Sequence, residues 1–248
     1  ALIMAGGANF PGAMPWENGK KVFHNAIYIL NRQKETFTWL SDTGYQLPES
    51  IAYGATVALE EGLLCMGGET ANGYSRTCYM LGWDPATNKI AFRDMPALPE
   101  GLANAAAAAI GRKVYLAGGE TTNGVTNKVW QLDMDALYAG WKEMPALPAP
   151  KSHFQLVVQS DGEMPALYAI GGRCATASGI SKLSSDCLKF EHNKWKPLAS
   201  VSDGQHIQHW SAGTAVAYGA TYILLLGGDD GRIFNQIETY NAAIKAGG

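Results

Sequence analysis

VYLAGG (residues 114–119) is a short apolar run that ends in a pair of glycines, and the chain contains four counterparts of it. These are LIMAGG (2–7), LLCMGG (63–68), LYAIGG (167–172) and ILLLGG (223–228). The glycine pairs recur with a period of roughly fifty residues, which is typical of proteins built from repeated units. Short apolar runs bounded by glycine indicate strands. The sequence therefore predicts a small β unit that is repeated along the chain.

Other features recur in step with the glycine pairs. A second apolar strand follows each of the first four pairs, and the strand after it carries an aromatic side chain. The apolar strands are AIYILN, TCYMLGWD, KVWQLD and DCLKFE, and the aromatic residues are Trp39, Phe92, Trp141 and Trp195. A corner containing proline then leads to the next unit, as in DMPALPEG (94–101) and EMPALPAP (143–150), with weaker versions at Pro48 and Pro197. We expect each aromatic residue to pack against the neighbouring unit. Four short antiparallel strands per unit predict a β-propeller.

The units resemble the kelch repeat over roughly residues 1–232. We therefore expect an all-β kelch β-propeller in a single domain, with repeat units over roughly 1–49, 50–100, 101–150, 151–204 and 205–248. The first unit begins at the second strand of its blade, and the last shows only its first two strands. About five of six blades are thus represented, and we expect further chain, beyond Gly248 or elsewhere, to close the ring. Ile233, Ile237, Tyr240 and Ile244 follow a helical period, which predicts a short inserted helix over Phe234–Ala246.

Composition narrows the class of protein. Of the 248 residues, 47% are hydrophobic and 17% are charged, so the chain can bury a sizeable core. A net charge of −3 offers no basic surface to nucleic acid, and no apolar run approaches the ~18 residues of a membrane span. The chain opens on Ala1 without a signal-peptide pattern, so its beginning does not reveal the compartment. Four cysteines without a CxxC spacing favour reduced side chains on strands over a disulfide scaffold or a zinc site.

Three segments carry a closer resemblance. They are AGGANFPG (5–12) with the long loop behind it, AYGATVALEEGLLCMGGETANG (52–73) and GGDDGRIFN (227–235). These segments resemble the sialic acid (N-acetylneuraminate) mutarotases, or epimerases, which are bacterial six-bladed kelch propellers. In the well-known members the IFN blade precedes the AGG blade, whereas here it follows, so the chain resembles the cyclically permuted mutarotase group. The resemblance implies an isomerase of the α and β anomers of N-acetylneuraminate. It also implies a small-molecule sugar as partner, no cofactor, and a periplasmic or secreted location.

The loop over 8–25 is the first candidate for a ligand-binding wall. In a propeller the loops after the second strand and those before the first strand converge on one face, and loops commonly carry the site. Asn9, Phe10, Trp16 and Asn25 are therefore candidates to line a pocket, although Trp16 could equally pack the loop onto the surface. The resemblance adds Asn235, in the IFN segment, as a further substrate-binding candidate.

The chemistry of a mutarotase sets what to look for. Opening a cyclic hemiketal takes a general base and a general acid, and sialic acid also needs a cation for its carboxylate. The resemblance implies a Gly-Glu pair with an arginine six residues after the glutamate, on a blade expected after Gly248. The catalytic residues of this chain are therefore left open, and we expect the 248-residue segment alone to catalyse poorly. Glu69, with Arg76 seven residues later, is a weak candidate pair, because such a loop carboxylate can also be a structural hydrogen-bond acceptor.

Two further candidates directly follow glycine pairs. Glu120 follows Gly119, at the same place in its unit as Glu69. Arg173 follows Gly172 and could bind a carboxylate with two parallel hydrogen bonds. The alternative for Arg173 is a surface ion pair with Asp186 or Glu191.

Two histidines lie in corners that precede a first strand. His153 and His209 are therefore expected at the pocket end, where a histidine can also hydrogen-bond its own loop. His206 and His209 form an HxxH pattern, but no helix and no third ligand surround it, so no metal site is predicted. DDGR (229–232) reads as a turn and lacks the spaced oxygen ligands of a calcium loop.

Two other function classes stay open. A kelch module that binds a glycan or a protein without chemistry would have the same fold, and fold alone does not give function. An oxidase of the copper-radical kind, built on kelch blades, would need a set of Tyr, Cys and His ligands. The cysteines here lie on predicted strands, which argues against that class.

Overall fold

The computed structural model describes residues 1–14, 17–40, 44–174 and 181–232. The chain divides into two compact units, Ala1–Ala103 and Asn104–Gly248, each built from antiparallel sheets. The predicted helix over Phe234–Ala246 lies outside the described residues, so it stays a prediction.

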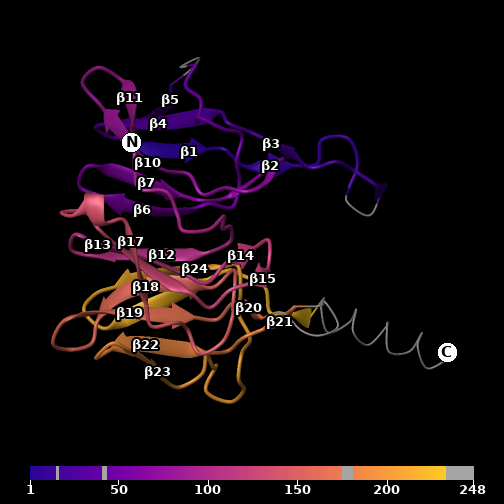
Figure 1. Ribbon diagram of the computed structural model, residues 1–248, viewed down its shortest axis with the longest axis vertical. Helices are drawn as coiled ribbons and strands as arrows, with labels where there is room; N and C mark the ends of the chain where they lie inside the picture. The colour runs from indigo at the N-terminus through magenta and orange to yellow at the C-terminus, as the bar shows by residue number, and fades with distance from the viewer. Residues whose placement is uncertain (15–16, 41–43, 175–180, 233–248) are drawn as a thin grey trace. The chain divides into compact units, whose positions relative to one another are not determined.

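Unit 1 (Ala1–Ala103) holds two main sheets (Figure 1). The first has three strands in the order β1-β4-β5, and the second has four in the order β11-β10-β7-β6. The strands of the first sheet are β1 (Leu2–Ala5), β4 (Ile27–Gln33) and β5 (Thr36–Trp39). Those of the second are β6 (Ala55–Leu59), β7 (Gly62–Met66), β10 (Cys78–Asp84) and β11 (Lys89–Asp94). The second sheet has the four-stranded meander that the repeat predicts.

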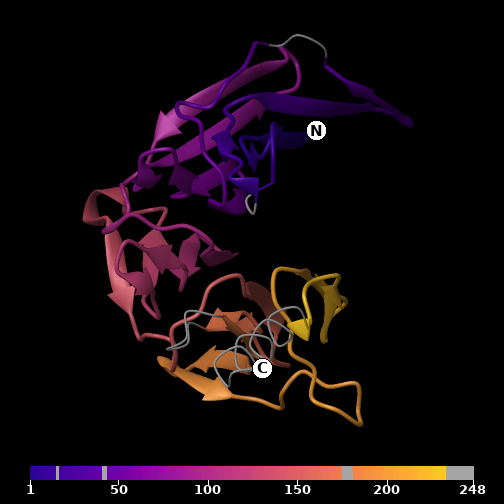
Figure 2. The ribbon, with the colours of Figure 1, turned by 90° about the vertical axis from the view of Figure 1, so that its right-hand side faces the viewer.

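Unit 2 (Asn104–Gly248) repeats this meander twice and adds a hairpin (Figure 2, magenta to yellow). The first sheet contains β12 (Ala106–Ile110), β13 (Lys113–Ala117), β16 (Val129–Asp133) and β17 (Trp141–Met144). The second contains β18 (Gln155–Ser160), β19 (Pro165–Ile170), β22 (Cys187–Glu191) and β23 (Lys194–Pro197). The hairpin pairs β24 (Thr214–Tyr218) with β25 (Tyr222–Leu226). A short 3-10 helix, η2 (Leu137–Ala139), precedes β17.

A small two-stranded arm follows each of the first four glycine pairs, and the sequence did not predict it. The arms are β2 (Ala8–Asn9) with β3 (Val22–Phe23), β8 (Glu69–Thr70) with β9 (Gly73–Tyr74), β14 (Glu120–Thr121) with β15 (Gly124–Val125), and β20 (Arg173–Cys174) with β21 (Lys182–Leu183). The residue after the glycine pair therefore stands at the base of an arm. The long loop over 8–25 is the first of these arms with its enlarged tip.

The glycine pair is required by the approach of the next repeat. At the second glycine the backbone N–H donates to a carbonyl at the start of the following repeat, as from Gly119 to Lys151 O (2.9 Å) and from Gly172 to Trp210 O (2.8 Å). At the first glycine a Cβ would meet the same carbonyl, only 2.4 Å from Lys151 O in the case of Gly118. Gly118 also has φ +59°, which disfavours any side chain. The glycine pair thus forms the contact between consecutive repeats, which we call the repeat seam.

Apolar side chains between consecutive sheets form the core of each unit. In unit 1 they come from β4, β10 and the loop before β6, and in unit 2 from β12, β13, β16, β18, β19, β22 and the loop before β18, with Leu147 from the proline corner. The fully buried members include Ile29 and Leu81 in unit 1, and Phe154, Leu167 and Ala169 in unit 2. A second cluster in unit 2 packs Trp210 against β18 and the β24–β25 hairpin. Burying these side chains is the main stabilising term of such sheets.

The predicted role of the outer-strand aromatic residues is correct in one sheet and wrong in another. Trp195 on β23 donates its Nε1–H to the carbonyl of Pro145 in the preceding repeat, at 2.9 Å. Phe92 on β11 instead packs edge-on against Tyr79 of its own sheet, with ring centroids 5.7 Å apart. Phe92 therefore packs on a diagonal neighbour in β10, since its directly paired residue there is Leu81.

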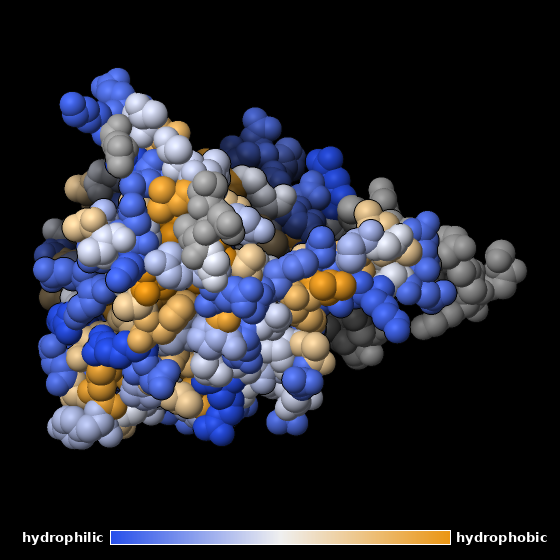
Figure 3. All heavy atoms as spheres, turned by 90° about the horizontal axis from the view of Figure 1, so that it is seen from above, coloured by the Kyte–Doolittle hydropathy of each residue, from blue (hydrophilic) through white to orange (hydrophobic). Residues whose placement is uncertain are grey.

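Figure 3 shows small apolar patches between polar side chains on the face seen there. Exposed apolar side chains of the three-stranded sheet are Leu2, Met4, Tyr28, Phe37 and Trp39, and those of the β24–β25 hairpin are Val216, Tyr218, Tyr222, Leu224 and Leu226. No helix among the described residues is long and apolar enough to cross a membrane.

Candidate functional site

Two positions recur beside the glycine pairs and lie together at one end of the sheets. One is the residue after the pair, and the other is in the loop before the first strand. Isolated bridges join them: Ala52 with Glu69, Ser152 with Arg173, and Ser211 with Asp229. The residue that directly follows this loop position has a left-handed backbone in four repeats. Its φ is 60° at Tyr53, 54° at Asn104, 55° at His153 and 53° at Ala212. This conformation costs about 1 kcal/mol or more for a residue other than glycine, so its recurrence indicates that the fold requires it. We call the bridged pair of positions, with the left-handed residue beside it, the frame.

In unit 2 this frame brings together three residues predicted from the sequence: Glu120, His153 and Arg173. Ser152 lies between them. Its Oγ donates to Glu120 Oε1 at 2.9 Å and lies 2.9 Å from His153 Nδ1, and its backbone pairs with Arg173. His153 Nδ1 is 3.5 Å from Glu120 Oε1, and the second carboxylate oxygen accepts from Asn104 Nδ2 at 3.0 Å. Residues from two consecutive repeats thus form one polar cluster.

The surroundings of His153 keep its imidazole neutral. Burial lowers the pKa of His153 below its ordinary value of 6.5, the nearby Arg173 cation lowers it further, and Glu120 acts in the opposite direction. The side chains of His153, Glu120 and Arg173 remain 23%, 28% and 25% exposed, so a solute can reach them. A neutral imidazole beside a cation and a carboxylate can accept and return a proton near neutral pH.

The predicted ion-pair partners of Arg173 are wrong. Its Nη2 lies 3.5 Å from Asp229 Oδ2, across the bridge to the next repeat. Glu191 is at the far end of β22, where it pairs with Lys189 and Lys196. Asp186 pairs with Lys151 instead, at 3.2 Å. Arg173 thus belongs to the polar cluster because it opens an arm beside the next repeat.

Lys151 lies beneath the cluster, in the same loop as His153. Its side chain is fully buried, and its Nζ donates to Gly171 O at 3.3 Å and to Asp186 Oδ2 at 3.2 Å. These bonds tie the loop that carries His153 to the glycine turn that carries Arg173.

Unit 1 presents a different group at the corresponding positions. Glu69 binds Lys21 through both carboxylate oxygens, at 3.2 and 3.1 Å. The Lys21 ammonium also lies over the rings of Tyr53, at 5.0 Å, and Phe23, at 5.4 Å. Arg76 does not share this group, because its Nε donates to Leu98 O at 2.7 Å and so holds the proline corner. The weak candidates Glu69 and Arg76 therefore have different partners.

The remaining candidates from the sequence lie at several places. Asn9 Oδ1 is 2.9 Å from His24 Nε2 at the base of the long arm, while Phe10 is half-buried. Asn25 Nδ2 donates to Gln46 Oε1 at 3.4 Å, and His209 is exposed in the loop before Trp210. Trp16 and Asn235 lie outside the described residues.

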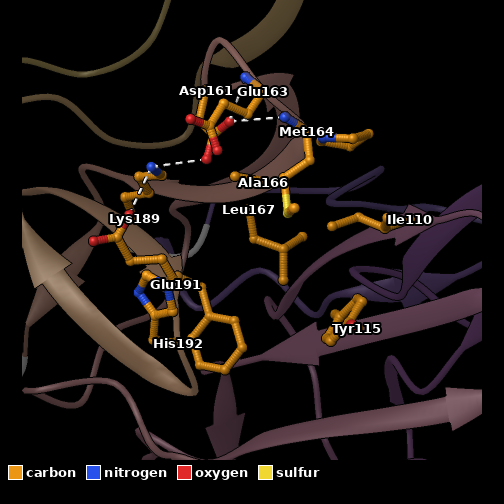
Figure 4. A pocket seen from close by; sticks show the side chains of 12 residues that line it. Ile110, Tyr115, Asp161, Glu163, Met164, Ala166, Leu167, Lys189, Glu191 and His192 are labelled. Carbon is orange, nitrogen blue, oxygen red and sulfur yellow. Dashed lines mark hydrogen bonds and ion pairs between the residues drawn. The ribbon is translucent and has the colours of Figure 1, made fainter.

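A cavity at the opposite, turn end of unit 2 is a second place to consider (Figure 4). It measures about 560 Å³, and Figure 4 shows Lys189 between Asp161 and Glu191, across from Met164 and Tyr115. Lys189 Nζ lies 3.0 Å from Asp161 and 2.7 Å from Glu191. Hydrogen bonds from Lys189 and Lys196 lower the pKa of Glu191 to about 2, so the carboxylate stays charged. The polar groups satisfy one another here, which suits a structural network.

The cysteines do not form a nucleophilic site. Cys65 lies opposite Tyr79 and Cys78 opposite Met66, and all four cysteines are free thiols. Burial raises the pKa of Cys65 to about 11 and that of Cys78 to about 12, so both are protonated at neutral pH. Among the described residues no three His, Cys, Asp or Glu side chains gather as metal ligands.

Comparison with known proteins adds curated relatives. N-acetylneuraminate epimerase of Vibrio cholerae is 39% identical over 99 residues, which are 36% of this chain and 24% of that protein. The same enzyme of Vibrio vulnificus is 37% identical over 89 residues, 33% of this chain and 22% of that protein. The same enzyme of Haemophilus influenzae strain 86-028NP is 38% identical over 84 residues, 30% of this chain and 21% of that protein. The predicted resemblance to the N-acetylneuraminate epimerases is confirmed.

The matched part spans under a quarter of the length of these relatives. No family model matches the chain. The solved structure of YjhT superimposes with a TM-score of 0.70 at 17% identity and covers 92% of this chain and 74% of that one. The predicted fold class, an all-β kelch β-propeller, is confirmed. The number of blades, the cyclic permutation and the C-terminal helix stay predictions.

Sequence reasoning missed several members of the cluster: Asn104, Lys151, Ser152 and Asp229. The signal that could have found them is the alignment of the repeats on their glycine pairs. Ser152 and Ser211 stand where the second repeat has Ala52, and His153 stands where it has Tyr53.

Proposed function

We propose that the protein interconverts the α and β anomers of N-acetylneuraminate, with proton transfer at the cluster of Glu120, His153 and Arg173. The observation that carries the proposal is a neutral imidazole held beside a carboxylate and a guanidinium. The substrate comes from the name of the curated relatives. The activity of the whole protein is part of the proposal, because the matched part is a fraction of those relatives.

The reaction requires one proton to move twice. N-acetylneuraminate is a cyclic hemiketal with a carboxylate on its anomeric carbon. His153 takes the proton of the anomeric hydroxyl, the bond from the anomeric carbon to the ring oxygen breaks, and the imidazolium protonates the ring oxygen. The open ketone then turns and closes on its other face by the reverse steps. Protons are conserved and no electrons are transferred.

The other two residues act on charge. Glu120, 3.5 Å from His153 Nδ1, stabilises the imidazolium while it holds the proton. The guanidinium of Arg173 carries five N–H donors and can bind the substrate carboxylate in addition to Asp229. Fixing the carboxylate places the anomeric hydroxyl for proton transfer.

The test follows freshly dissolved β-anomer by proton NMR, with the protein and in buffer. We expect the protein to accelerate the decay of the signal, because the proposed cluster lies within the 248 residues; this departs from the expectation, drawn from the resemblance, that the segment alone catalyses poorly. His153→Gln should lower the rate by about 100-fold or more, the usual contribution of a general acid–base. Arg173→Met should mainly raise KM. His192→Asn, in the exposed turn between β22 and β23, is the matched control and should behave as the unmodified protein.

The pH profile gives a second readout. The neutral form of His153 is the base, and its pKa lies below the ordinary value of 6.5. The catalysed rate should therefore hold as the pH falls to 6.5 and decline only at lower pH. A rate equal to that of buffer would refute the enzyme, and sugar binding without acceleration would favour the kelch binding module instead.

A further inference from the structure

A short chain of hydrogen bonds stands behind His153. Ser152 Oγ lies 2.9 Å from both Glu120 Oε1 and His153 Nδ1, and Ser152 is only 1% exposed. A serine hydroxyl has one hydrogen, and an ionised carboxylate can only accept. Ser152 therefore gives its hydrogen to Glu120 and can only accept from the ring nitrogen. This assigns the imidazole proton to Nδ1.

The carboxylate is itself fixed from the other side. Asn104 Nδ2 donates to Glu120 Oε2 at 3.0 Å, so each carboxylate oxygen has its own donor. Glu120 Oε1 also lies 3.5 Å from His153 Nδ1, where an acceptor again favours a proton on that nitrogen. Both neighbours of Nδ1 thus require the same tautomer.

Comparison of the repeats shows that the fold does not need this hydroxyl. Ala52 occupies the position of Ser152 in the second repeat and makes the same backbone bridge, there to Glu69. The left-handed residue that follows Ala52 is Tyr53, in place of His153. The frame tolerates alanine at this position, so the backbone bridge does not need the Ser152 hydroxyl, which instead contacts the ring of His153. Ser211, the serine of the next repeat, precedes Ala212 and donates to the carbonyl of His153.

We infer that Ser152 is a positioning residue: with Glu120 and Asn104 behind it, it holds His153 in the Nδ1–H tautomer and presents Nε2 as the proton acceptor. The tautomer is a property of the free protein. Its use in catalysis rests on the proposed function, because only then does Nε2 meet the anomeric hydroxyl.

The direct test is long-range ¹H–¹⁵N NMR of protein labelled in its five histidines, with His153 assigned by its loss in His153→Gln. At pH 8 the unmodified protein should show a protonated Nδ1 and an unprotonated Nε2 at His153. Ser152→Ala should mix the two tautomers. Ser211→Ala is the matched control, because this buried hydroxyl donates to the carbonyl of His153, at 3.2 Å, and not to the ring. Its spectrum should keep the tautomer.

The kinetic arm separates this inference from the proposed function. Ser152→Ala should lower kcat by about 10- to 100-fold with little change in KM, a part of the usual acid–base contribution. A protonated Nε2 in the unmodified protein, or an unchanged tautomer in Ser152→Ala, would overturn the inference even if the enzyme is active. A protein that shows the expected tautomer but no acceleration would leave the positioning intact and refute the proposed function.

Discussion

Lys151 places a buried charge where the other repeats have an apolar side chain. Ile51, Leu102 and Trp210 offer the equivalent carbonyl to a glycine pair, and each is buried. The Lys151 side chain is 0% exposed, whereas that of its partner Asp186 is 51% exposed. The charge pair is therefore asymmetric, because water can solvate the aspartate alone but not the lysine.

This asymmetry predicts unequal costs for removing the two partners. Asp186→Ala leaves an ammonium buried without its counter-charge and should lower the free energy of unfolding by about 3 kcal/mol. Lys151→Leu supplies the side chain found in the repeat before it, and should change the free energy of unfolding by about 1 kcal/mol or less. Urea unfolding at pH 7 measures both. A larger loss in Lys151→Leu than in Asp186→Ala would contradict the argument.

At the scale of single residues the sequence predicted part of the cluster. Glu120 and Arg173 could be found because each follows a glycine pair, and His153 because it precedes a first strand. Ser152 and Lys151 were missed, since a serine and a lysine in a corner read as ordinary surface residues and only an alignment of the repeats on their glycine pairs marks their positions. Their roles depend on burial and on contacts across the repeat seam, which no local pattern records.

The glycine turn is the element that joins one repeat to the next. In Gly118→Ala the new Cβ would lie 2.4 Å from Lys151 O and 2.6 Å from Phe154 Cε1, in a backbone with φ +59°. Gly227 has nearly the same backbone, φ +63°, but among the described residues nothing lies within 4 Å of its Cβ position. The two glycines differ only in what packs against them.

Gly118→Ala should therefore destabilise the protein more than Gly227→Ala. In both variants a left-handed alanine lowers the free energy of unfolding by about 1–2 kcal/mol. In Gly118→Ala the clash lowers it by a further 1–3 kcal/mol, roughly. Denaturant midpoints of the two variants, compared with the unmodified protein, give the difference. Equal losses would show that conformational freedom alone, and not the approach of the next repeat, explains the motif.

The main strands were predictable as elements because each apolar run ends at a glycine or a corner. The arms after the glycine pairs were not, because β8, β14 and β20 are two-residue strands of mixed composition. Their pairing comes from the turn geometry and not from hydrophobic alternation. Glu69, Glu120 and Arg173 could still be found as candidates, but their place at the base of an arm could not.

Exposed apolar strands matter at the scale of the whole molecule. Among the described strands β1 pairs with β4 alone, and Leu2 and Met4 on β1 are 56% and 54% exposed. A strand edge with apolar side chains is a template for pairing with another chain. The unmodified 248-residue chain should therefore self-associate as its concentration rises.

Charges on this strand should suppress the association. The double variant Leu2→Lys with Met4→Lys should lower the apparent mass in concentrated solution and change the free energy of unfolding by about 0.5 kcal/mol or less. Tyr138→Lys is the control, because this 95% exposed tyrosine lies on η2, away from a strand edge, and should leave the mass unchanged. Light scattering over a concentration series measures the effect. An unchanged mass in the double variant would exclude β1 as the contact.

The fold class followed from the sequence at this scale, since the glycine period and the strands and corners in step with it indicate a propeller. The number of six blades came from the resemblance and stays a prediction, because it depends on how the repeats close around an axis.

The left-handed position before each first strand has an evolutionary consequence. The backbone there is nearly identical in four repeats, yet it carries a tyrosine, an asparagine, a histidine and an alanine, at Tyr53, Asn104, His153 and Ala212. The position thus accepts different side chains on one backbone, so a single codon change can alter the chemistry there without changing the scaffold. Duplication of a blade copies this position as well, so each added blade provides one more position where a new functional side chain can evolve.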